Sequence, residues 1–184
     1  MENQIYSDIK TRMSKTVEHY NHEVAIIRTG RASADILDTV KVDYYGTMSP
    51  LKNIAHISVP EAQSIIIQPF DPNSLETIEK AIVASDLGLS PNNDGDLIRL
   101  NIPALTEERR KELVKIVHKT IEEGRVAIRN LRRDGNEQLK ELEKSNEISE
   151  DNLKRALDNI QELTDEFVKK LNDIQDFKEK EILS

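Results

Sequence analysis

Three stretches of this sequence carry apolar residues at alternating steps of three and four positions, and no other feature constrains the fold as strongly. They cover about residues 2–28, residues 106–145 and the C-terminal part from Ser149 onward. This spacing aligns apolar side chains along one face of an α-helix. Helices with such stripes bury them against one another, so the sequence predicts a long three-helix bundle. Its second helix would be roughly 60 Å long.

Two glycines fall within the apolar stripe of the second stretch. Gly124 and Gly135 each cost on the order of 1 kcal/mol relative to alanine inside a helix. Both nevertheless occupy positions that the stripe assigns to the buried face. We interpret them as packing glycines, because a missing side chain lets a neighbouring helix approach closely. The stripe of the third stretch is predicted to extend as far as Ile174 and Phe177.

The predicted helices begin and end at residues that favour helix termini. Gly30 follows the first helix and can adopt the positive φ that ends a helix at little cost. Thr106 can cap the second helix, and the break at Ser145-Asn146 ends it. Ser149 can cap the third helix. The three helices therefore have plausible starts and stops in the sequence itself.

Between about residues 31 and 104 the helical spacing disappears, and short β-like runs replace it. These runs are Val40–Tyr44, Thr47–Leu51, His56–Val59, Ser64–Gln68 and Asp96–Ile102. One helix is predicted from Leu75 to Leu87, with Asn73 or Ser74 as its N-cap and Gly88 as its stop. Residues 92–96 are interpreted as a polar turn. The fold class is therefore α+β, with a small α/β domain of β/α/β sandwich-like type inserted into the bundle.

This insertion predicts two domains joined by two chain crossings. Residues 1–29 and 106–184 would form the bundle, and residues 30–105 the inserted domain. A short paired connection lets a small domain swing as a body. We therefore predict a hinge at 28–33 and 102–105, made by Arg28, Thr29, Gly30, Arg31, Ile102, Pro103 and Ala104.

The composition narrows the setting in which such a protein works. The chain has no cysteine, which excludes disulfides and thiolate chemistry and favours a reducing compartment, so we expect a cytoplasmic protein. We find no signal segment and no apolar run near the ~20 residues of a membrane span. The net charge of -8 means that nucleic-acid binding would have to come from a local basic patch. We expect a monomer that needs no cofactor and no metal.

Such a basic patch is present on the predicted second helix. Residues 109–133 contain nine lysines and arginines, Arg110 among them, against three glutamates, a net charge of +6 on an acidic chain. Within it Arg125, Arg129, Arg132 and Arg133 fall inside roughly 100° of the helical wheel and away from the apolar stripe. We predict that all four face solvent or a partner.

A solvated helix face is the ordinary interpretation of a charge run, but the composition of this row argues against it. The row has arginine and no lysine, and Glu122 and Glu123 could pair with at most two of its four members. Guanidinium groups grip phosphate in a bidentate manner, so phosphate binding is the better hypothesis. Four contacts lose roughly 100-fold in affinity as salt rises from about 50 to 200 mM, so a second contact surface is expected. Because no aromatics interleave with the row, we expect recognition of folded RNA through its backbone.

Catalytic interpretations have little support in the sequence. The four histidines are scattered, and His19 and His22 lack a third metal ligand. The segment 92–96 resembles a calcium loop only faintly, because Asn101 stands where a bidentate glutamate is needed. No phosphate-cradling glycine loop and no nucleophile elbow is present. We therefore predict that the protein is not an enzyme.

Several longer motifs, in the same order along the chain, make the sequence similar to the ribosome recycling factor family over its whole length. They are Arg28–Ser33 (RTGRAS), Tyr44–Thr47 (YYGT), Glu79–Leu89 (EKAIVASDLGL), Leu105–Lys111 (LTEERRK), Arg125–Asp134 (RVAIRNLRRD) and Glu147–Asp151 (EISED).

The resemblance implies an L-shaped protein of near-tRNA dimensions that acts after translation termination. It would bind the large ribosomal subunit and, with elongation factor G and GTP hydrolysis by that partner, separate the subunits. The resemblance places ribosomal RNA against Arg129 and Arg132, and we extend the contact to Arg125 and Arg133 beside them. It also places the hinge at the RTGRAS segment.

Two hypotheses from other classes compete with this one. The first is a helical adaptor or chaperone-like module that binds partner proteins through its stripes and acidic third helix. The second is a hydrolase hidden in the α/β domain, for which we find no paired nucleophile and base. Binding that survives nuclease and salt would favour the adaptor.

Overall fold

The structure is a computed structural model that describes residues 1–184, and its chain forms two compact units. One consists of Met1–Thr29 together with Glu107–Ser184, and the other of Gly30–Thr106. Each unit has its own core of buried aliphatic side chains.

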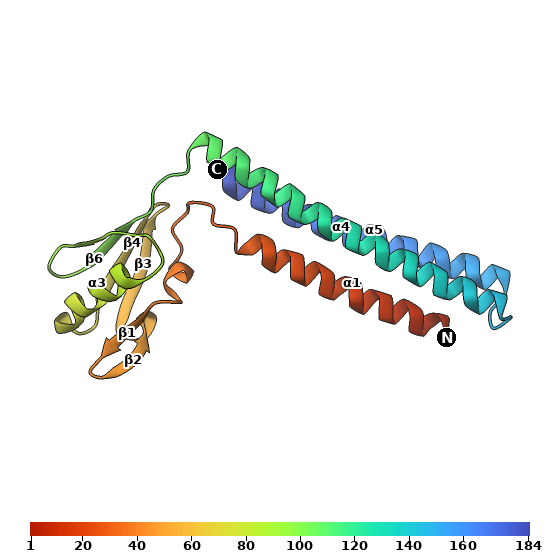
Figure 1. The fold of residues 1–184 in the computed structure, drawn as a ribbon, viewed down its shortest axis with the longest axis horizontal. Coiled ribbons are helices and arrows are strands. Elements are labelled where there is room, and N and C mark those ends of the chain that lie inside the picture. Colours follow the sequence, from red (N-terminus) through yellow and green to blue (C-terminus); the bar gives the residue numbers. More distant parts are fainter. The chain divides into compact units, whose positions relative to one another are not determined.

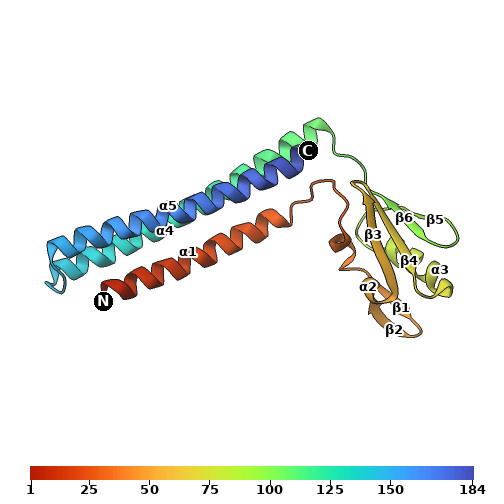
Figure 2. The same ribbon diagram turned by 180° about the vertical axis from the view of Figure 1, so that it is seen from behind.

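The first unit is a bundle of three long helices, α1 (Glu2–Ala25), α4 (Glu107–Lys144) and α5 (Glu150–Leu183). The helices lie side by side, and the N-terminus is near the end of the bundle where α4 turns into α5 (Figures 1 and 2). Their apolar stripes face inward, and the buried positions include Ile9, Met13, Val117, Ile121, Ile128, Leu139, Leu163, Phe167 and Leu171. The three-helix bundle is confirmed. None of its helices is long and apolar enough to cross a membrane.

The two glycines of α4 have the packing role that the sequence predicts. A Cβ on Gly124 would lie 3.1 Å from the ring of Tyr20 on α1 and 3.2 Å from Leu171 on α5. A Cβ on Gly135 would lie 3.0 Å from Ile9. Glycine at these two positions therefore lets α1 approach α4 more closely than a side chain would allow.

The first helix is shorter than predicted, and Gly30 is not its cap. α1 ends at Ala25, and Ile26 caps it in an ordinary right-handed conformation. Gly30 has a φ of +73°, and a Cβ there would lie 2.6 Å from Cγ of Leu105. Gly30 is therefore required where the two chain crossings touch, beyond the position at which the helix ends.

The turn between α4 and α5 follows the prediction closely. Asn146 takes a positive φ of 58°, and the amide of Glu147 donates to the carbonyl of Leu142 at 2.8 Å. This is the pattern of a Schellman C-cap with asparagine in the left-handed position. Ser149 then accepts a hydrogen bond from the amide of Asn152 and caps α5.

The stripe of α5 departs from the prediction at its C-terminal end. Phe177 is 74% exposed, whereas its neighbour Lys178 is buried and forms an ion pair with Glu181 at 3.4 Å. A helix of 3.6 residues per turn drifts against a repeat of three and four, so the buried face passes to the next residue over a helix of this length.

The second unit contains two sheets. A hairpin pairs β1 (Lys41–Tyr44) with β2 (Thr47–Pro50). A four-stranded antiparallel sheet has the order β3-β4-β6-β5, formed by Ala55–Glu61, Ser64–Pro69, Ile98–Asn101 and Pro91–Asn93. The helix α3 (Leu75–Ala84) lies beside this sheet (Figure 1).

The core of this unit lies between α3 and the sheets. Ile65 and Ile67 on β4 and Ile98 and Leu100 on β6 are fully buried, as alternation along a strand requires. On α3, Ile78 and Ile82 occupy adjacent turns of the buried face. The prediction of a small mixed unit built on one helix is confirmed.

Two local predictions for this unit are wrong, and two short helices were not predicted. Residues 92–96 are only partly a turn, because Pro91–Asn93 form β5, which pairs with β6. The helix predicted to reach Leu87 ends at Ala84, where Ser85 becomes extended. The short helices η1 (Ala34–Leu37) and α2 (Leu51–Ile54) were not predicted, since four residues are too few to show a helical period.

Candidate nucleic-acid interface

The predicted arginine row lies on α4, and the buried positions of that helix decide how each member points. Arg125 and Arg129 directly follow the buried Gly124 and Ile128. One step along an α-helix is a rotation of about 100°, so both side chains leave the helix at the margin of its inward face. The surroundings of the four arginines therefore differ.

Arg125 is held inside the bundle surface rather than presented to solvent. Its side chain is 19% exposed. Its Nε donates to Asn172 at 2.9 Å, and one terminal nitrogen donates to Gln175 at 2.8 Å, both on α5. The other terminal nitrogen donates to Glu122 at 2.7 Å. The prediction that all four arginines face solvent or a partner is wrong for Arg125, because antiparallel α5 offers it amide acceptors.

Glu122 also reaches the next arginine of the row. Its second carboxylate oxygen accepts from Arg129 at 3.2 Å. The hydrogen bond from Arg125, with support from Arg129, lowers the pKa of Glu122 below its ordinary value. One acid therefore serves two arginines, while the side chain of Arg129 remains 44% exposed.

Arg132 and Arg133 occupy the next turn of α4. Arg132 is half-buried and donates to Oε1 of Gln161 on α5 at 3.2 Å, a bond to a neutral acceptor. Arg133 is exposed, and its side chain makes no hydrogen bond or ion pair within the chain. Its guanidinium is the member of the row most available to an incoming anion.

The acid that follows Arg133 in the sequence does not neutralise it. Asp134 accepts a hydrogen bond from Arg12 of α1 at 2.6 Å. This contact holds the pKa of Asp134 below its ordinary value. Because Arg12 engages Asp134 and no other acid bonds to Arg133, the positive charge of Arg133 remains uncompensated.

Arg110 lies apart from the row. It precedes Arg125 by 15 positions, which is roughly 22 Å along a helix. Around it the charges are paired locally, Arg109 with Glu112 at 2.9 Å and Lys111 with Glu107 at 3.1 Å. Arg110 itself is half-buried. The structure therefore does not bring it together with the other four arginines.

The predicted hinge residues have anchors on either side. Thr29 donates to Glu181 of α5 at 3.4 Å, which ties the chain to the bundle. The amide of Ala32 donates to the carbonyl of Ala62 at 2.7 Å, and the amide of Ile102 to that of Gln63 at 2.8 Å, in the turn between β3 and β4. Two residues separate Thr29 from Ala32 in the first crossing, and the second crossing, residues 102–106, has no regular secondary structure.

Sequence reasoning missed the amide side chains of α5 that accept hydrogen bonds from the arginine row. Asn172, Gln175 and Gln161 are polar residues on an amphipathic helix, and nothing in their type marks them as partners. A signal was nevertheless available, because residues at similar distances from the turn of an antiparallel helical hairpin face each other. No group of three or more His, Asp or Glu side chains is placed to hold a metal ion.

Comparison with known proteins places this geometry in a family. A sequence model described as "Ribosome recycling factor" matches residues 20–183. The ribosome-recycling factor of Bacillus pumilus is 52% identical over 183 residues, which is 100% of this chain and 99% of that protein. That of Halothermothrix orenii is 50% identical over 180 residues, covering 98% and 97%. The chain belongs to the ribosome recycling factor family.

Solved members of the ribosome recycling factor family share the fold. A solution structure of a ribosome recycling factor is 44% identical, with a TM-score of 0.74 over 99% of this chain and 97% of that one. A second match, 47% identical with a TM-score of 0.63 over all of both chains, comes from models for the T. thermophilus ribosome recycling factor and E. coli elongation factor G bound to the E. coli post-termination complex. The resemblance found in the sequence is therefore confirmed.

Proposed function

We propose that this chain binds the post-termination ribosome and, together with elongation factor G and GTP, promotes dissociation of the ribosome into subunits. Family membership supports the reaction, and the T. thermophilus relative is described with elongation factor G on such a complex. The chain acts mechanically, and GTP hydrolysis belongs to its partner. It works as a monomer on cytoplasmic ribosomes.

The outer part of the arginine row is the anchor on large-subunit ribosomal RNA. The observation that carries this assignment is the exposed and unpaired guanidinium of Arg133, one position from Arg132 and four from Arg129. Arg129 and Arg132 each have one long bond, at 3.2 Å, that a phosphate oxygen can replace. Arg125 contributes charge, but its bonds to α5 make it a support for the anchor. Arg110 is a separate and weaker contact.

The two compact units act as two domains, and residues 28–33 and 102–105 are the hinge between them. Hydrogen bonds hold Thr29, Ala32 and Ile102 in place. The pivot is therefore limited to Gly30 and Arg31 in one crossing and to Pro103–Leu105 in the other. At Gly30 the positive φ and the contact with Leu105 leave no room for a side chain. A push on the small domain passes to the anchored bundle through these residues.

The adaptor hypothesis loses its main support in the structure. The stripes through which an adaptor would bind its partners are buried within the bundle, with Ile9, Met13 and Leu171 fully covered. An adaptor would have to use the remaining surface, which is dominated by charged side chains.

The decisive experiment mixes post-termination ribosomes with the protein, elongation factor G and GTP. Light scattering then measures the splitting of the ribosomes into subunits. The intact protein should split ribosomes only when both are present. A preparation that is folded by circular dichroism and still splits no ribosomes would overturn the proposal.

The hinge has its own test. Gly30→Ala should slow splitting about tenfold or more while leaving binding to isolated large subunits within about twofold of wild type, because the anchor lies elsewhere. Gly88→Ala is the matched control, since Gly88 also has a positive φ but open space around it. Equal rates for the two variants would remove Gly30 from the hinge.

A further inference from the structure

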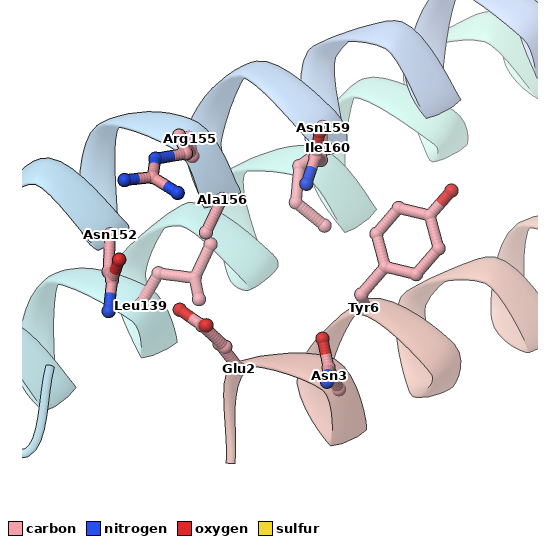
Figure 3. Close-up of a pocket in the computed structure, with 9 residues that line it drawn as sticks. All are labelled: Glu2, Asn3, Tyr6, Leu139, Asn152, Arg155, Ala156, Asn159 and Ile160. Atoms are coloured by element: carbon pink, nitrogen blue, oxygen red, sulfur yellow. The ribbon is translucent and has the colours of Figure 1, made fainter.

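A cavity of about 460 Å³ lies in the bundle between the first turns of α1 and the first turns of α5, with Leu139 of α4 also lining it (Figure 3). Its size falls in the range of roughly 300–1,000 Å³ typical of small-ligand sites. Glu2, Asn3 and Tyr6 line it from α1, and Asn152, Arg155 and Asn159 from α5. None of these residues belongs to the arginine row or to the hinge.

The polar side chains of this cavity have no partners within the chain. Oε2 of Glu2 is closed off from solvent and accepts no hydrogen bond. The side chains of Asn3, Asn159 and Arg155 are exposed to solvent and, like that of the half-buried Asn152, make no hydrogen bond within the chain. A buried polar group without a partner is costly, and a ligand that supplies donors to the carboxylate would remove that cost.

The chemistry of the lining selects the kind of ligand. A divalent cation prefers several carboxylates, and here Glu2 is the only one, with Arg155 nearby. A purely apolar ligand would leave the closed-off carboxylate oxygen of Glu2 unsatisfied. A flat heterocycle with two adjacent N–H donors fits better, because it can meet both oxygens of one carboxylate. Oε2 of Glu2 is closed off as it stands, but the terminal torsion of glutamate is soft, and rotation about it can bring both oxygens to the cavity.

We propose that this cavity holds the base of an unpaired guanosine of RNA. The Watson–Crick edge of guanine carries two adjacent donors, N1–H and the N2 amino group, and both would donate to Glu2. Adenine, cytosine and uracil each lack this pair of donors. The amide groups of Asn152 and Asn159 can donate to O6, and Arg155, which also lines the cavity, would bind the phosphate. Single-stranded bases are commonly read in this manner on their Watson–Crick edges.

The location ties the cavity to the arginine row, and the inference rests on the proposed ribosomal RNA partner. Asn159 and Ile160 of the cavity directly precede Gln161, which accepts from Arg132. Leu139 follows Arg133 by six positions, roughly 9 Å along α4. The cavity would therefore supply the second contact surface that is expected beside the arginine row. The row still grips backbone, whereas the cavity adds one base-specific contact.

The test uses the full-length, ¹⁵N-labelled protein with any purification tag at the C-terminus, titrated with each of the four nucleoside monophosphates at millimolar concentration. Guanosine monophosphate alone should shift the amide signals of Asn3 and the side-chain signals of Asn152 and Asn159. Glu2→Gln should weaken its binding about 10- to 100-fold, because glutamine offers one acceptor instead of two. Glu18→Gln is the matched control, a glutamate on the same helix outside the cavity.

Arg155→Ala separates base from phosphate recognition. This substitution should weaken the binding of guanosine monophosphate but leave the binding of guanosine unchanged, whereas Glu2→Gln should weaken the binding of both. Equal shifts with all four nucleotides, no shift with any, or full binding by Glu2→Gln would each overturn the inference.

A photo-crosslinking amino acid in place of Asn3 identifies the source of the base. With large subunits it should label a guanosine of ribosomal RNA, and labelling of any other nucleotide or of protein alone would overturn the assignment to RNA. The subunit-splitting assay remains independent of these results. If the protein splits ribosomes normally but binds no guanosine monophosphate, the role assigned to the cavity is wrong and the proposed function still holds.

Discussion

Arg125 and Arg133 lie eight residues apart on the same face of α4, yet they have opposite surroundings. Arg125 donates from all three of its nitrogens to side chains of the bundle and is 19% exposed. Arg133 is exposed and bonds to nothing in the chain. Between them, Arg129 and Arg132 are each held by a single longer bond.

The difference shows that a row of like residues divides into support and contact according to the acceptors that surround each member. Where α5 presents Asn172 and Gln175, the guanidinium becomes part of the helix–helix interface. Where Asp134 forms an ion pair with Arg12 instead, the guanidinium of the adjacent Arg133 stays available to a partner. We therefore expect substitutions at the two ends of the row to act on different properties, namely stability and binding.

The largest effect should follow from removing the outer arginines. Arg129→Ala combined with Arg133→Ala should lower affinity for large ribosomal subunits by about 100-fold, since hydrogen bonds between charged groups contribute about 1.5–3 kcal/mol each. In a plot of the logarithm of the binding constant against the logarithm of salt concentration, the slope should become shallower by roughly 2. Pelleting of large subunits across a salt series measures both quantities.

The unfolding midpoint of this double variant should stay within about 1 °C of wild type, because neither arginine is buried. Lys115→Ala combined with Lys119→Ala is the matched control, two exposed cations on α4 outside the row. Affinity as high as that of the control would mean that the outer arginines are not the anchor.

Arg125→Ala should act on stability instead. It removes three hydrogen bonds and leaves the half-buried Asn172 and Gln175 without their donor, so the free energy of unfolding should fall by about 2 kcal/mol. Arg125→Lys should be almost as unstable, because an ammonium cannot reproduce the planar fork, but it should bind large subunits normally. Denaturant titration and pelleting separate these outcomes, and a stable Arg125→Ala would contradict the support role.

A smaller effect is expected at the ion pair that keeps Asp134 away from Arg133. The folded pKa of Asp134 is lowered by Arg12, so its stabilising contribution is present above the unfolded pKa of about 3.9 and is lost as pH falls through the folded pKa. Both side chains are more than 40% exposed, which limits the contribution to roughly 0.5–1 kcal/mol.

The variant Asp134→Asn should therefore be less stable than wild type at about pH 7, and this difference should shrink as pH falls through the lowered folded pKa of Asp134. Thermal unfolding at a series of pH values provides the comparison. A stability difference that persists unchanged in acid would show that lost packing, rather than lost charge, is its cause.

The smallest effect should come from Glu122, the acid that touches both kinds of arginine. Glu122→Gln should cost only a few tenths of a kcal/mol in stability, because the carboxylate is half exposed. It should also raise affinity for large subunits about twofold by releasing Arg129 and removing a negative charge. A titration at low salt is sensitive enough to detect this, and weaker binding would argue that Glu122 positions Arg129 productively.

The bundle was predictable from the sequence because its determinants are local and repeated. The spacing of the stripes, the cap at Ser149 and the break at Asn146 each act over a few residues. Gly124 and Gly135 could be interpreted correctly because a glycine costs helix stability, and on a buried stripe close packing offsets that cost. The slip from Phe177 to Lys178 could not be predicted, because it depends on the accumulated drift of a helix of 34 residues.

The small unit was less predictable, since its strands are defined by partners distant in sequence. Pro91–Asn93 contains no residue that favours a strand, and it is extended because β6 pairs with it. Gly30 was assigned to the nearest helix end, whereas its actual constraint is Leu105, which belongs to the other chain crossing.

The candidate site lies between these cases. The helical wheel placed the four arginines on one face, and the structure keeps them there. The helical wheel could not show that Asn172 and Gln175 lie opposite Arg125, because their position depends on the pairing of α4 with α5. The cavity at Glu2 had no signal in the sequence at all, since its lining joins residues from opposite ends of the chain.

The contact between Arg12 and Asp134 spans 122 residues, and this has a consequence for how the polypeptide folds during synthesis. The helical hairpin of α4 and α5 and the unit from Gly30 to Thr106 each form from continuous chain. The apolar face of α1, with Ile9 and Met13, is made first but has no surface to dock on until the last helices have emerged. Because contacts distant in sequence form slowly, we expect docking of α1 to be the step that completes the native state.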